Sequence, residues 1–437
     1  MRALLINPPV HDFACFDYWL KPLGLLYIAD YLEKNGIDIT LFDFMDRHSP
    51  FLSETSASRE YSTGNFVREK TVKPDILSTI DRPFYRYGVK QEAFEAFLED
   101  NHFDYGFVTS MMTYWYKGVD EVLSVLKDYS VPSILGGIYA RLLPDHALSL
   151  RPDFLYTGSI KGLKDFLNYR TDMTIDRDYS YEDLMPRYDL YRGNTGASIL
   201  TQTGCPFRCD YCAVPVLNSN VHFFDHDYVL SVLDNLSHLG IEDIALYDDA
   251  LLYRSEEHFK PLFRRIAQRN YPMRFHFSNG LHVNYIDRET VDIMTSLNIG
   301  RIALSIESIS ADFHREHDNK ADMPHIERAI ELFKSTDMDP SDIYVYIIAG
   351  IPGETLQMID NAVEFIHEKG VRILMNEFSP VPGTPIYERY SDRLSDPLLT
   401  GKTVFGPMFA YSMDEIQSIK NKIKKYNREI DFGSTAD

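Results

Sequence analysis

The sequence contains few cysteines and no long apolar run. Only four cysteines occur in 437 residues, and three of them, Cys205, Cys209 and Cys212, lie within eight positions. A disulfide framework spreads its cysteines along a chain, so this clustering indicates a metal site in a reducing compartment. No apolar stretch is long enough to span a bilayer, and the apolar stretch at the N-terminus is too short for a signal peptide. We therefore predict a cytoplasmic protein that has no membrane partner.

Positive charge is also scarce. The chain has 44 Lys and Arg residues against 65 Asp and Glu residues, which gives a formal net charge of −21. A surface this acidic repels phosphate backbones, which argues against a nucleic-acid partner. Hydrophobic residues make up 44% of the chain and charged residues 25%, as in ordinary globular proteins. A chain of this length is expected to form more than one domain.

Short β-rich runs alternate with helical patterns in residues 1–160. An amphipathic helical pattern over 23–32 separates the first two runs. Alternation of strands and helices predicts a parallel, doubly wound, Rossmann-like sheet. Residues 46–100 interrupt the pattern, and we predict an irregular, partly helical insertion there. The predicted strands are 3–6, 39–43, 105–109, 133–135 and 154–157.

The alternation resumes after residues 161–195, a charged, tyrosine-rich segment that is predicted to be a linker. Six further strand–helix units predict a (β/α)6 partial TIM barrel over 196–390. Loops at the carboxyl ends of barrel strands carry the chemistry of such folds. Residues 391–437 are predicted to form a short helical C-terminal extension. The predicted barrel strands are 197–202, 243–248, 273–278, 301–307, 343–349 and 373–379.

The clustered cysteines follow the first barrel strand with the spacing C-x3-C-x2-C. Three thiolates on one short loop can each bind a different iron of a cubane cluster, which leaves the fourth iron open for a cosubstrate. A structural zinc site usually takes four protein ligands in two separated pairs, and the only other cysteine is the distant Cys15. A ferredoxin-type cluster also needs a fourth cysteine. The spacing therefore favours an open iron–sulfur cluster.

This motif, with Tyr211 before its last cysteine, resembles the signature of the radical S-adenosylmethionine (SAM) superfamily. The other landmarks of that family follow the later strands in order, and the resemblance covers about 195–390. It implies a [4Fe-4S] cluster, reductive cleavage of SAM to a 5′-deoxyadenosyl radical, a reductant such as flavodoxin or ferredoxin, and a small-molecule substrate. The landmark segments are 247–249, 278–281, 305–308, 348–354 and 378–385.

The resemblance also implies roles for individual residues. Asp248 or Asp249 would bind the SAM ammonium, where the family usually has Gly-Gly-Glu; a helix N-cap is the alternative for this acidic pair. The ribose hydroxyls would contact Asn279, Glu307 and Ser308. A carboxylate that follows the apolar run 302–306 needs a partner, which favours a functional Glu307. The adenine would lie against Gly350 and Ile351, with edge contacts from Tyr211.

A doubly wound domain ahead of such a barrel resembles the cobalamin-binding class of radical SAM enzymes. The cues include Asn7-Pro8-Pro9, and the resemblance places a corrinoid at the carboxyl edge of the sheet, near Thr109, Ser110, Gly136 and Gly137. The D-x-H-x-x-G motif that supplies an axial histidine is absent after the first strand. The resemblance implies cobalamin-dependent methyl transfer to an unactivated carbon, or to phosphorus, of a small molecule. Cyclisation or rearrangement without cobalamin, and a non-catalytic metal-binding module, remain as alternatives.

Overall fold

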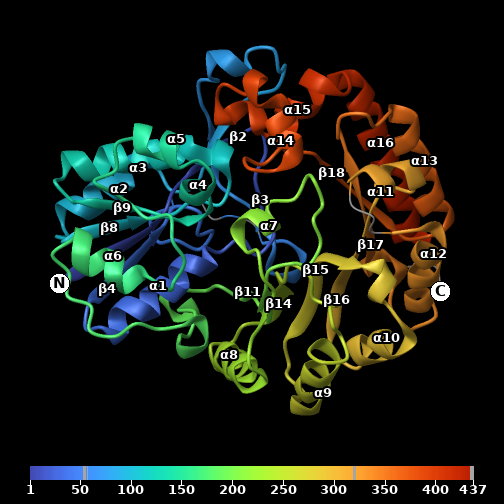
Figure 1. Cartoon of the computed structure of the whole chain (residues 1–437), viewed down its shortest axis with the longest axis horizontal. Helices are drawn as coiled ribbons and strands as arrows, with labels where there is room; N and C mark the ends of the chain where they lie inside the picture. The colour runs from blue at the N-terminus through green and yellow to red at the C-terminus, as the bar shows by residue number, and fades with distance from the viewer. Residues whose placement is uncertain (53–55, 57, 318–320, 434–437) are drawn as a thin grey trace. The chain divides into compact units, whose positions relative to one another are not determined.

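The computed structural model of the chain describes residues 1–52, 56, 58–317 and 321–433 (Figure 1). The chain divides into two compact units. The first comprises Met1–Ser198, Asp227–Ile241 and Asp396–Leu399, and the second comprises Ile199–His226, Glu242–Ser395 and Thr400–Asp437. Among the helices described, none combines the length and the apolar composition needed to cross a membrane.

A five-stranded parallel sheet forms the centre of the first unit. Residues 3–6 of its strand β1 are completely buried, as expected for a strand covered on both faces. The strand order runs outward in both directions from β1 and β8, which confirms the predicted doubly wound topology and places its switch point between these two strands. The order is β10 (Phe154–Leu155), β9 (Ser133–Leu135), β8 (Tyr105–Val108), β1 (Arg2–Asn7) and β4 (Asp38–Asp43).

Helices connect the strands of this sheet. The predicted helix at 23–32 is present as α1 (Leu23–Lys34), and its buried face includes Leu25, Leu26 and Tyr31. Helix α2 packs on β4 through aromatic contacts, with ring centroids 4.7 Å apart for Phe42 and Phe94. The remaining helices are α2 (Gln91–Glu99), α3 (Tyr116–Asp128), α4 (Gly137–Leu142), α5 (Pro144–Ser149), α6 (Leu163–Arg170) and α8 (His226–His238), the last lying mainly in this unit.

The predicted irregular insertion at 46–100 contains short strands as well as α2. β7 (Tyr85–Tyr87) pairs antiparallel with β2 (Val10–Asp12) and β6 (Arg68–Lys70), and β5 (Gly64–Asn65) pairs with β3 (Phe16–Asp17). Strands this short carry almost no periodic signal in sequence, which is why the pattern did not reveal them. Residues 53–55 and 57 of the insertion lie outside the described part.

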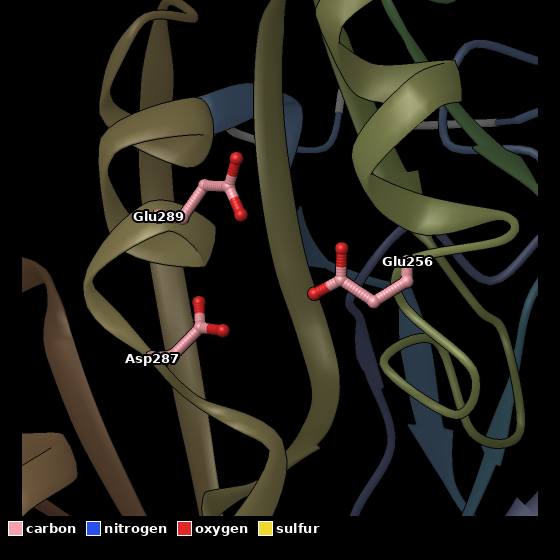
Figure 2. Close-up of side chains that lie close together, drawn as sticks. All are labelled: Glu256, Asp287 and Glu289. Carbon is pink, nitrogen blue, oxygen red and sulfur yellow. The ribbon is translucent and has the colours of Figure 1, made fainter.

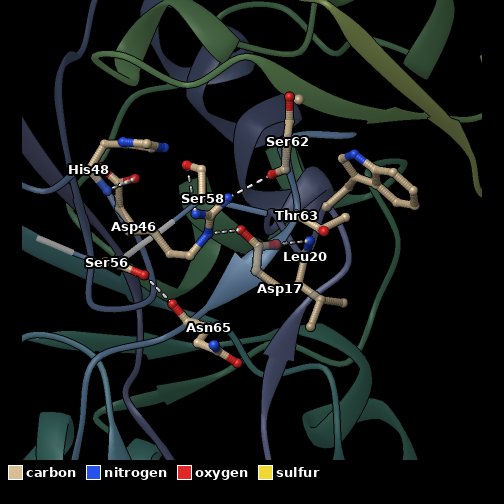
Figure 3. Close-up of polar contacts among 12 residues, drawn as sticks. Asp17, Leu20, Asp46, His48, Ser56, Ser58, Ser62, Thr63 and Asn65 are labelled. Atoms are coloured by element: carbon tan, nitrogen blue, oxygen red, sulfur yellow. Dashed lines mark hydrogen bonds and ion pairs between the residues drawn. The ribbon is translucent and has the colours of Figure 1, made fainter. Parts of the chain in front are cut away.

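A buried ion pair connects Arg47, at the start of the insertion, to Asp17 at the end of β3. Arg47 donates from Nε to Asp17 Oδ2 at 2.8 Å and from Nη2 to the Ser62 carbonyl at 2.6 Å. Asp17 also accepts the Leu20 N–H at 2.8 Å (Figure 3). Arg47 is 5% exposed and Asp17 3% exposed, so each charge depends on the other for compensation. This pair therefore fixes the path of the insertion beside the carboxyl edge of the sheet.

A six-stranded sheet has the strand order expected for a partial barrel, and all of its strands after the first lie in the second unit. The strands from β14 onward run parallel, so their carboxyl ends share one edge. In Figure 1, α10, α12 and α13 lie together on one side of β16 and β17. The predicted partial barrel is confirmed. Its strands are β11 (Gly196–Ile199), β14 (Asp243–Leu246), β15 (Arg274–His282), β16 (Ile299–Glu307), β17 (Ile343–Ala349) and β18 (Arg372–Glu377).

The remaining elements of this unit connect or flank those strands. A two-stranded hairpin of β12 (Gln202–Thr203) and β13 (His222–Phe223) brackets the cysteine loop. The helices are α7 (Val214–Leu217), α9 (Phe259–Arg269), α10 (Arg288–Thr295), α11 (Ala311–His317), α12 (Met323–Lys334), α13 (Leu356–Glu368), α14 (Pro385–Tyr390), α15 (Lys402–Phe409) and α16 (Met413–Gly433).

The C-terminal extension is helical, as predicted, and covers the outer edge of β18. Asn427 of α16 accepts the Ile373 N–H and donates to the Ile373 carbonyl, both at 2.9 Å. Its side-chain amide thus replaces a neighbouring strand at an edge whose backbone groups would otherwise be unpaired. Lys420 pairs with Glu377 on the same strand at 2.6 Å. Residues 434–437 lie outside the described part of the extension.

Residues 161–195, predicted to be a linker, contain regular structure. They hold α6 and two short 3-10 turns, Tyr181–Asp183 and Tyr188–Leu190. The Tyr188 hydroxyl donates to the Ser198 carbonyl at 2.7 Å and is fully enclosed. In the structure the first unit extends through this segment to Ser198, while the domain boundaries at 160, 195 and 390 stay predictions.

Candidate active site

The three clustered cysteines lie on the loop between β12 and α7, beyond the carboxyl end of the first barrel strand. None of the three forms a disulfide among the described residues; Cys209 is buried and the other two are half-buried. The loop enters through Gly204, whose φ is +82°. A Cβ at this position would lie 2.2 Å from the Asn220 carbonyl oxygen, so only glycine fits. This tight entry fixes the direction in which Cys205 leaves the hairpin.

Asp249 holds the entry to the cysteine loop. Its Oδ2 accepts the Gly204 N–H at 2.7 Å. Burial raises the pKa of Asp249, while the Gly204 N–H and the Asn218 side chain favour its charged form. This contact is with the cysteine loop and not with a helix N-terminus, and the SAM-binding role of Asp249 stays a prediction.

Asp248 bonds to Thr201 and Gln202, the residues that lead into the cysteine loop. Its Oδ1 accepts the Thr201 N–H, the Thr201 hydroxyl and the Gln202 N–H, each at 2.7 Å. Burial raises the pKa of Asp248 to about 7. Among the described residues nothing bonds to its buried Oδ2. The SAM-binding role of Asp248 stays a prediction, and Oδ2 is the atom that remains available for it.

Asn279 and Ser278 lie inside β15, because this strand continues to His282 rather than ending at 278 as predicted. The Asn279 amide donates to the Asp248 carbonyl at 2.8 Å, so this residue connects β15 to the segment after β14. The Tyr346 hydroxyl, from β17, donates to the Ser278 carbonyl at 3.0 Å. The buried Ser278 Oγ has no partner in the part of the chain that the structure describes. Polar side chains from three strands therefore meet at this edge.

Glu307 ends β16 in an unusual backbone conformation. Its φ is +60°, in the left-handed region that a residue with a Cβ rarely adopts. Ser305 donates to its Oε1 at 2.5 Å, and the Ser308 N–H bonds to the Ile306 carbonyl at 2.6 Å. Such strain persists where the surroundings impose it, and it concentrates at ligand-binding sites. The ribose role of Glu307 and Ser308 remains a prediction that this geometry favours.

The end of β17 carries the residues that were predicted to contact adenine. Gly350 has φ +98°, and its N–H donates to Glu354 Oε2 at 3.0 Å. Ile351 is completely buried within the protein. Tyr211, on the cysteine loop, has its ring centroid 6.4 Å from that of Phe313 on α11. The adenine contacts stay predictions for these three residues.

Gln202 is a site residue that the sequence analysis missed. It precedes Cys205 by three positions and is completely buried. Neither atom of its side-chain amide has a hydrogen-bond partner within the described ranges. Buried amides are costly unless a ligand or an ordered water pairs with them. The available signal was its position at the end of a predicted strand, three residues ahead of the first cysteine.

An acidic cluster elsewhere in this unit has the spacing of a cation site but already contains a cation. The carboxylates of Glu256, Asp287 and Glu289 face one another (Figure 2). Lys260, whose side chain is 2% exposed, places its ammonium among them, 2.9 Å from Asp287 and 2.8 Å from Glu289. The cluster therefore serves an internal ion pair and is not a metal-site candidate.

In the first unit, the predicted corrinoid contacts lie on adjacent loops. Gly137 has φ +88°, and a Cβ there would lie 2.5 Å from Thr109 Oγ1. The Ser110 hydroxyl donates to the Met112 carbonyl at 3.2 Å, and the Gly136 N–H bonds to the Val108 carbonyl at 2.9 Å. The loops after β8 and β9 thus touch each other, and a ligand at this edge would lie over them rather than between them.

A small cavity lies at the switch point between β1 and β8. Its volume is about 30 Å³, which is room for about two water molecules and not for a corrin ring. The Trp115 indole in its wall donates to Asp12 at 2.9 Å. The cavity is a gap beneath the edge rather than the cofactor site itself. Its lining is Asn7, Pro8, Pro9, Val10, Cys15, Leu20, Met45, Phe66, Ser110, Met111 and Trp115.

Glu354 should make stability depend on pH. Burial raises the pKa of Glu354 from 4.5 to about 8. Between these values the folded protein keeps a proton that the unfolded chain releases, so rising pH lowers the free energy of unfolding. Burial raises the pKa of Asp43 to about 6 and acts in the same direction. We expect Glu354→Gln to be roughly 2–4 kcal/mol more stable than the wild type near pH 8, because its amide oxygen can still accept the Gly350 N–H.

Denaturant unfolding at several pH values between about 5 and 8 measures this effect. Glu368→Gln, at an exposed position on α13, is the matched control and should retain the wild-type slope. An unchanged slope in Glu354→Gln would contradict the assignment of the buried proton to this residue.

Comparisons with known proteins agree with this site. A model of the radical SAM superfamily matches residues 199–366. Ribosomal protein uS12 methylthiotransferase RimO of Crocosphaera subtropica (strain ATCC 51142 / BH68) is 23% identical over 230 residues, which cover 50% of this chain and 51% of RimO. Hopanoid C-2 methylase of Rhodopseudomonas palustris (strain TIE-1) is 21% identical over 285 residues, which cover 60% of this chain and 53% of the methylase. The chain spans about half the length of these curated relatives.

A solved structure shares the fold over most of the chain. The radical S-adenosylmethionine methyltransferase TsrM from Kitasatospora setae aligns with a TM-score of 0.61 and 15% identity, covering 90% of this chain and 76% of TsrM. At this identity the alignment shows the fold alone. The cysteine loop lies within the residues that the superfamily model matches, at the edge of the barrel where the polar strand ends gather. The chain therefore contains a domain of the radical SAM superfamily, a superfamily of enzymes, over residues 199–366.

Proposed function

We propose that this chain binds a [4Fe-4S] cluster and SAM in the barrel and a cobalamin on the first unit, and that it methylates an unactivated carbon, or phosphorus, of a small molecule. The observation that carries the proposal is the set of three cysteines on one loop whose entry is held by hydrogen bonds to Asp248 and Asp249. When bound, these groups would supply reductive cleavage of SAM to a 5′-deoxyadenosyl radical and a transferable methyl group.

The residues present suit the cluster and SAM. Three thiolates would hold three irons and leave one iron for the amino and carboxylate groups of SAM. Gln202, Asp248 Oδ2 and Ser278 Oγ are buried polar groups that have no partner among the described residues. Gln202 comes after β11, Asp248 comes after β14, and Ser278 lies in β15. All three are therefore near the carboxyl edge of the sheet, where the cysteine loop also lies. A polar ligand at this edge would satisfy them.

The first unit offers an apolar surface for a corrinoid. Met112, on the loop after β8, and Ile138, in the first turn of α4, are 40% and 38% exposed. Apolar side chains exposed at the carboxyl edge of a doubly wound sheet suit a ligand that lies across that edge. TsrM, which shares the fold, has been solved with cobalamin and a [4Fe-4S] cluster bound.

The relatives support group transfer that involves a methyl group. RimO is a methylthiotransferase and the hopanoid protein is a methylase, by their names. A small-molecule substrate and a reductant such as flavodoxin or ferredoxin complete the proposal. An electron donor is needed because the cleavage of SAM is reductive.

The test is anaerobic reconstitution of the full chain with iron, sulfide and a corrinoid. Incubation with methyl-deuterated SAM and a reductant should yield 5′-deoxyadenosine, together with the absorbance of a bound corrinoid. A deuterated methyl group should appear in a product when candidate small molecules are supplied. 5′-Deoxyadenosine without corrinoid uptake would favour cyclisation or rearrangement instead. A reconstituted cluster that does not cleave SAM would overturn the proposal.

A variant pair tests the corrinoid surface by itself. Ile138→Lys places a charge on the apolar edge and should lower corrinoid uptake, while iron content stays at the wild-type level. Leu148→Lys changes an apolar residue that is 53% exposed on α5 and is the matched control. Equal uptake in both variants would place the corrinoid elsewhere.

A further inference from the structure

Asp210, between the second and third cysteines, is hydrogen-bonded through both its backbone groups and its side chain. Its backbone N–H donates to the His317 carbonyl, and its carbonyl accepts the Ile386 N–H, both at 3.1 Å. His317 Nδ1 lies 3.1 Å from each oxygen of its carboxylate. Arg389 donates to its Oδ2 at 2.5 Å. Both backbone groups and both carboxylate oxygens are therefore bonded to helices α11 and α14.

The side chains of Asp210 and His317 are largely enclosed where they meet. The side chain of His317 is 7% exposed and that of Asp210 is 14% exposed. The Arg389 side chain is 57% exposed, so it meets the pair from the solvent side. Removing one member of an enclosed charge-assisted pair leaves the other without compensation. His317 is therefore the enclosed side-chain partner of Asp210, and Arg389 is the exposed one.

Helix α11 also holds the loop that follows β16. His314 Nε2 lies 2.8 Å from the Ser308 carbonyl, and His314 is buried. Phe313 lies between these two contacts, with its ring centroid 4.8 Å from His317 and 6.4 Å from Tyr211. One short helix therefore contacts both the cysteine loop and the loop of Glu307 and Ser308.

We propose that α11 is a brace that sets the position of the Cys209–Cys212 segment relative to the loop after β16, with His317 and Asp210 as its joint. The inference rests on the proposed function, in which the first segment holds the cluster and the second contacts SAM. Both residues are positioning residues, because they act through the thiolates and through Ser308. Residues that orient metal ligands typically change metal affinity or activity by roughly 10- to 100-fold when they are replaced.

The joint should also influence the electronic state of the cluster. Hydrogen bonds and nearby charge set the reduction potentials of iron–sulfur clusters. Replacing His317 with phenylalanine keeps a ring but removes the donor, so the Asp210 carboxylate loses a partner and the potential should fall. Asp210→Asn removes the negative charge, so the potential should rise. General damage to the fold would not be expected to shift the reduction potential in opposite directions in His317→Phe and Asp210→Asn.

The experiment compares the reconstituted full chain with His317→Phe, Asp210→Asn and the conservative His317→Gln, whose amide can donate to Asp210. Arg315→Ala is the matched control, because Arg315 pairs with Asp312 on the exposed side of the same helix. The readouts are iron content, the reduction potential, and the electron paramagnetic resonance spectrum of the reduced cluster with and without SAM. We expect roughly 10-fold weaker SAM binding in His317→Phe, partial recovery in His317→Gln and wild-type behaviour in Arg315→Ala.

Loss of iron in His317→Phe with retention in His317→Gln would support the brace equally well. Wild-type iron content, potential and spectrum in both His317→Phe and Asp210→Asn would overturn it. If the wild type itself binds a cluster but shows no response to SAM, the proposed function fails. Iron content and potential then still decide whether α11 positions the cysteine loop.

Discussion

Cys205→Ala should reduce the iron content from about four atoms per chain to near zero and bring SAM cleavage to background, because the cluster then has only two thiolates. Cys209→Ala and Cys212→Ala should behave in the same way, since the loop offers no replacement thiol. The only other cysteine, Cys15, lies in the other unit and packs against Val10, Met45, Phe66 and Tyr87. Iron and sulfide analysis together with anaerobic assay of 5′-deoxyadenosine measures the effect.

Cys15→Ala is the matched control for these variants and should retain both the cluster and SAM cleavage. Retention of a full cluster in any one of the three loop variants would show that the ligand set is wrong. Zinc in place of iron after anaerobic purification would point to a closed structural site and would contradict the proposed chemistry.

Asp248→Ala should destabilise the barrel by roughly 3 kcal/mol or more, because three buried donors lose their common acceptor and each unpaired donor costs about 1–3 kcal/mol. The donors belong to Thr201 and Gln202, directly ahead of the cysteine loop. We therefore expect a loss of iron together with the loss of stability. Denaturant unfolding and iron analysis measure the two effects.

Asp248→Asn separates the structural role of this residue from its predicted role in binding SAM. The amide oxygen can keep the three hydrogen bonds, so the fold and the cluster should survive. If Oδ2 binds the SAM ammonium, loss of the charge should weaken SAM binding by roughly 10-fold. Wild-type affinity in this variant would assign Asp248 to the support of the loop alone. Equal stability of Asp248→Ala and the wild type would contradict the structural role as well.

For the acidic pair Asp248 and Asp249, the sequence predicted the position correctly but did not predict the hydrogen bonds to the cysteine loop. The spacing placed Asp248 and Asp249 after the second barrel strand, where the structure has them. Both carboxylates turn back toward the cysteine loop, and Asp249 bonds to the residue before Cys205. No local pattern specifies that contact, because its partners are 45 positions apart in the chain.

The sequence alone was sufficient for features that depend on local order. Alternating apolar runs and helical patterns predicted both parallel sheets, because a buried parallel strand needs a continuous apolar segment of its own. The thiolates at Cys205, Cys209 and Cys212 share one loop, so their spacing alone predicted an open cluster site. The positions of Glu307 at the end of β16 and of Gly350 directly after β17 followed from the same alternation, whereas β15 continues past Asn279 to His282.

Only the tertiary structure decided which distant groups meet. The short strands of the insertion gain their order from pairing with β2 and β3 rather than from their own residues. The joint between Asp210 and His317 links positions 107 residues apart. The burial of Gln202, with no side-chain partner among the described residues, depends on the segments that surround it. Periodicity and spacing record what a segment buries, whereas long-range contacts and the pKa shifts they cause arise only when the folded chain brings remote segments together.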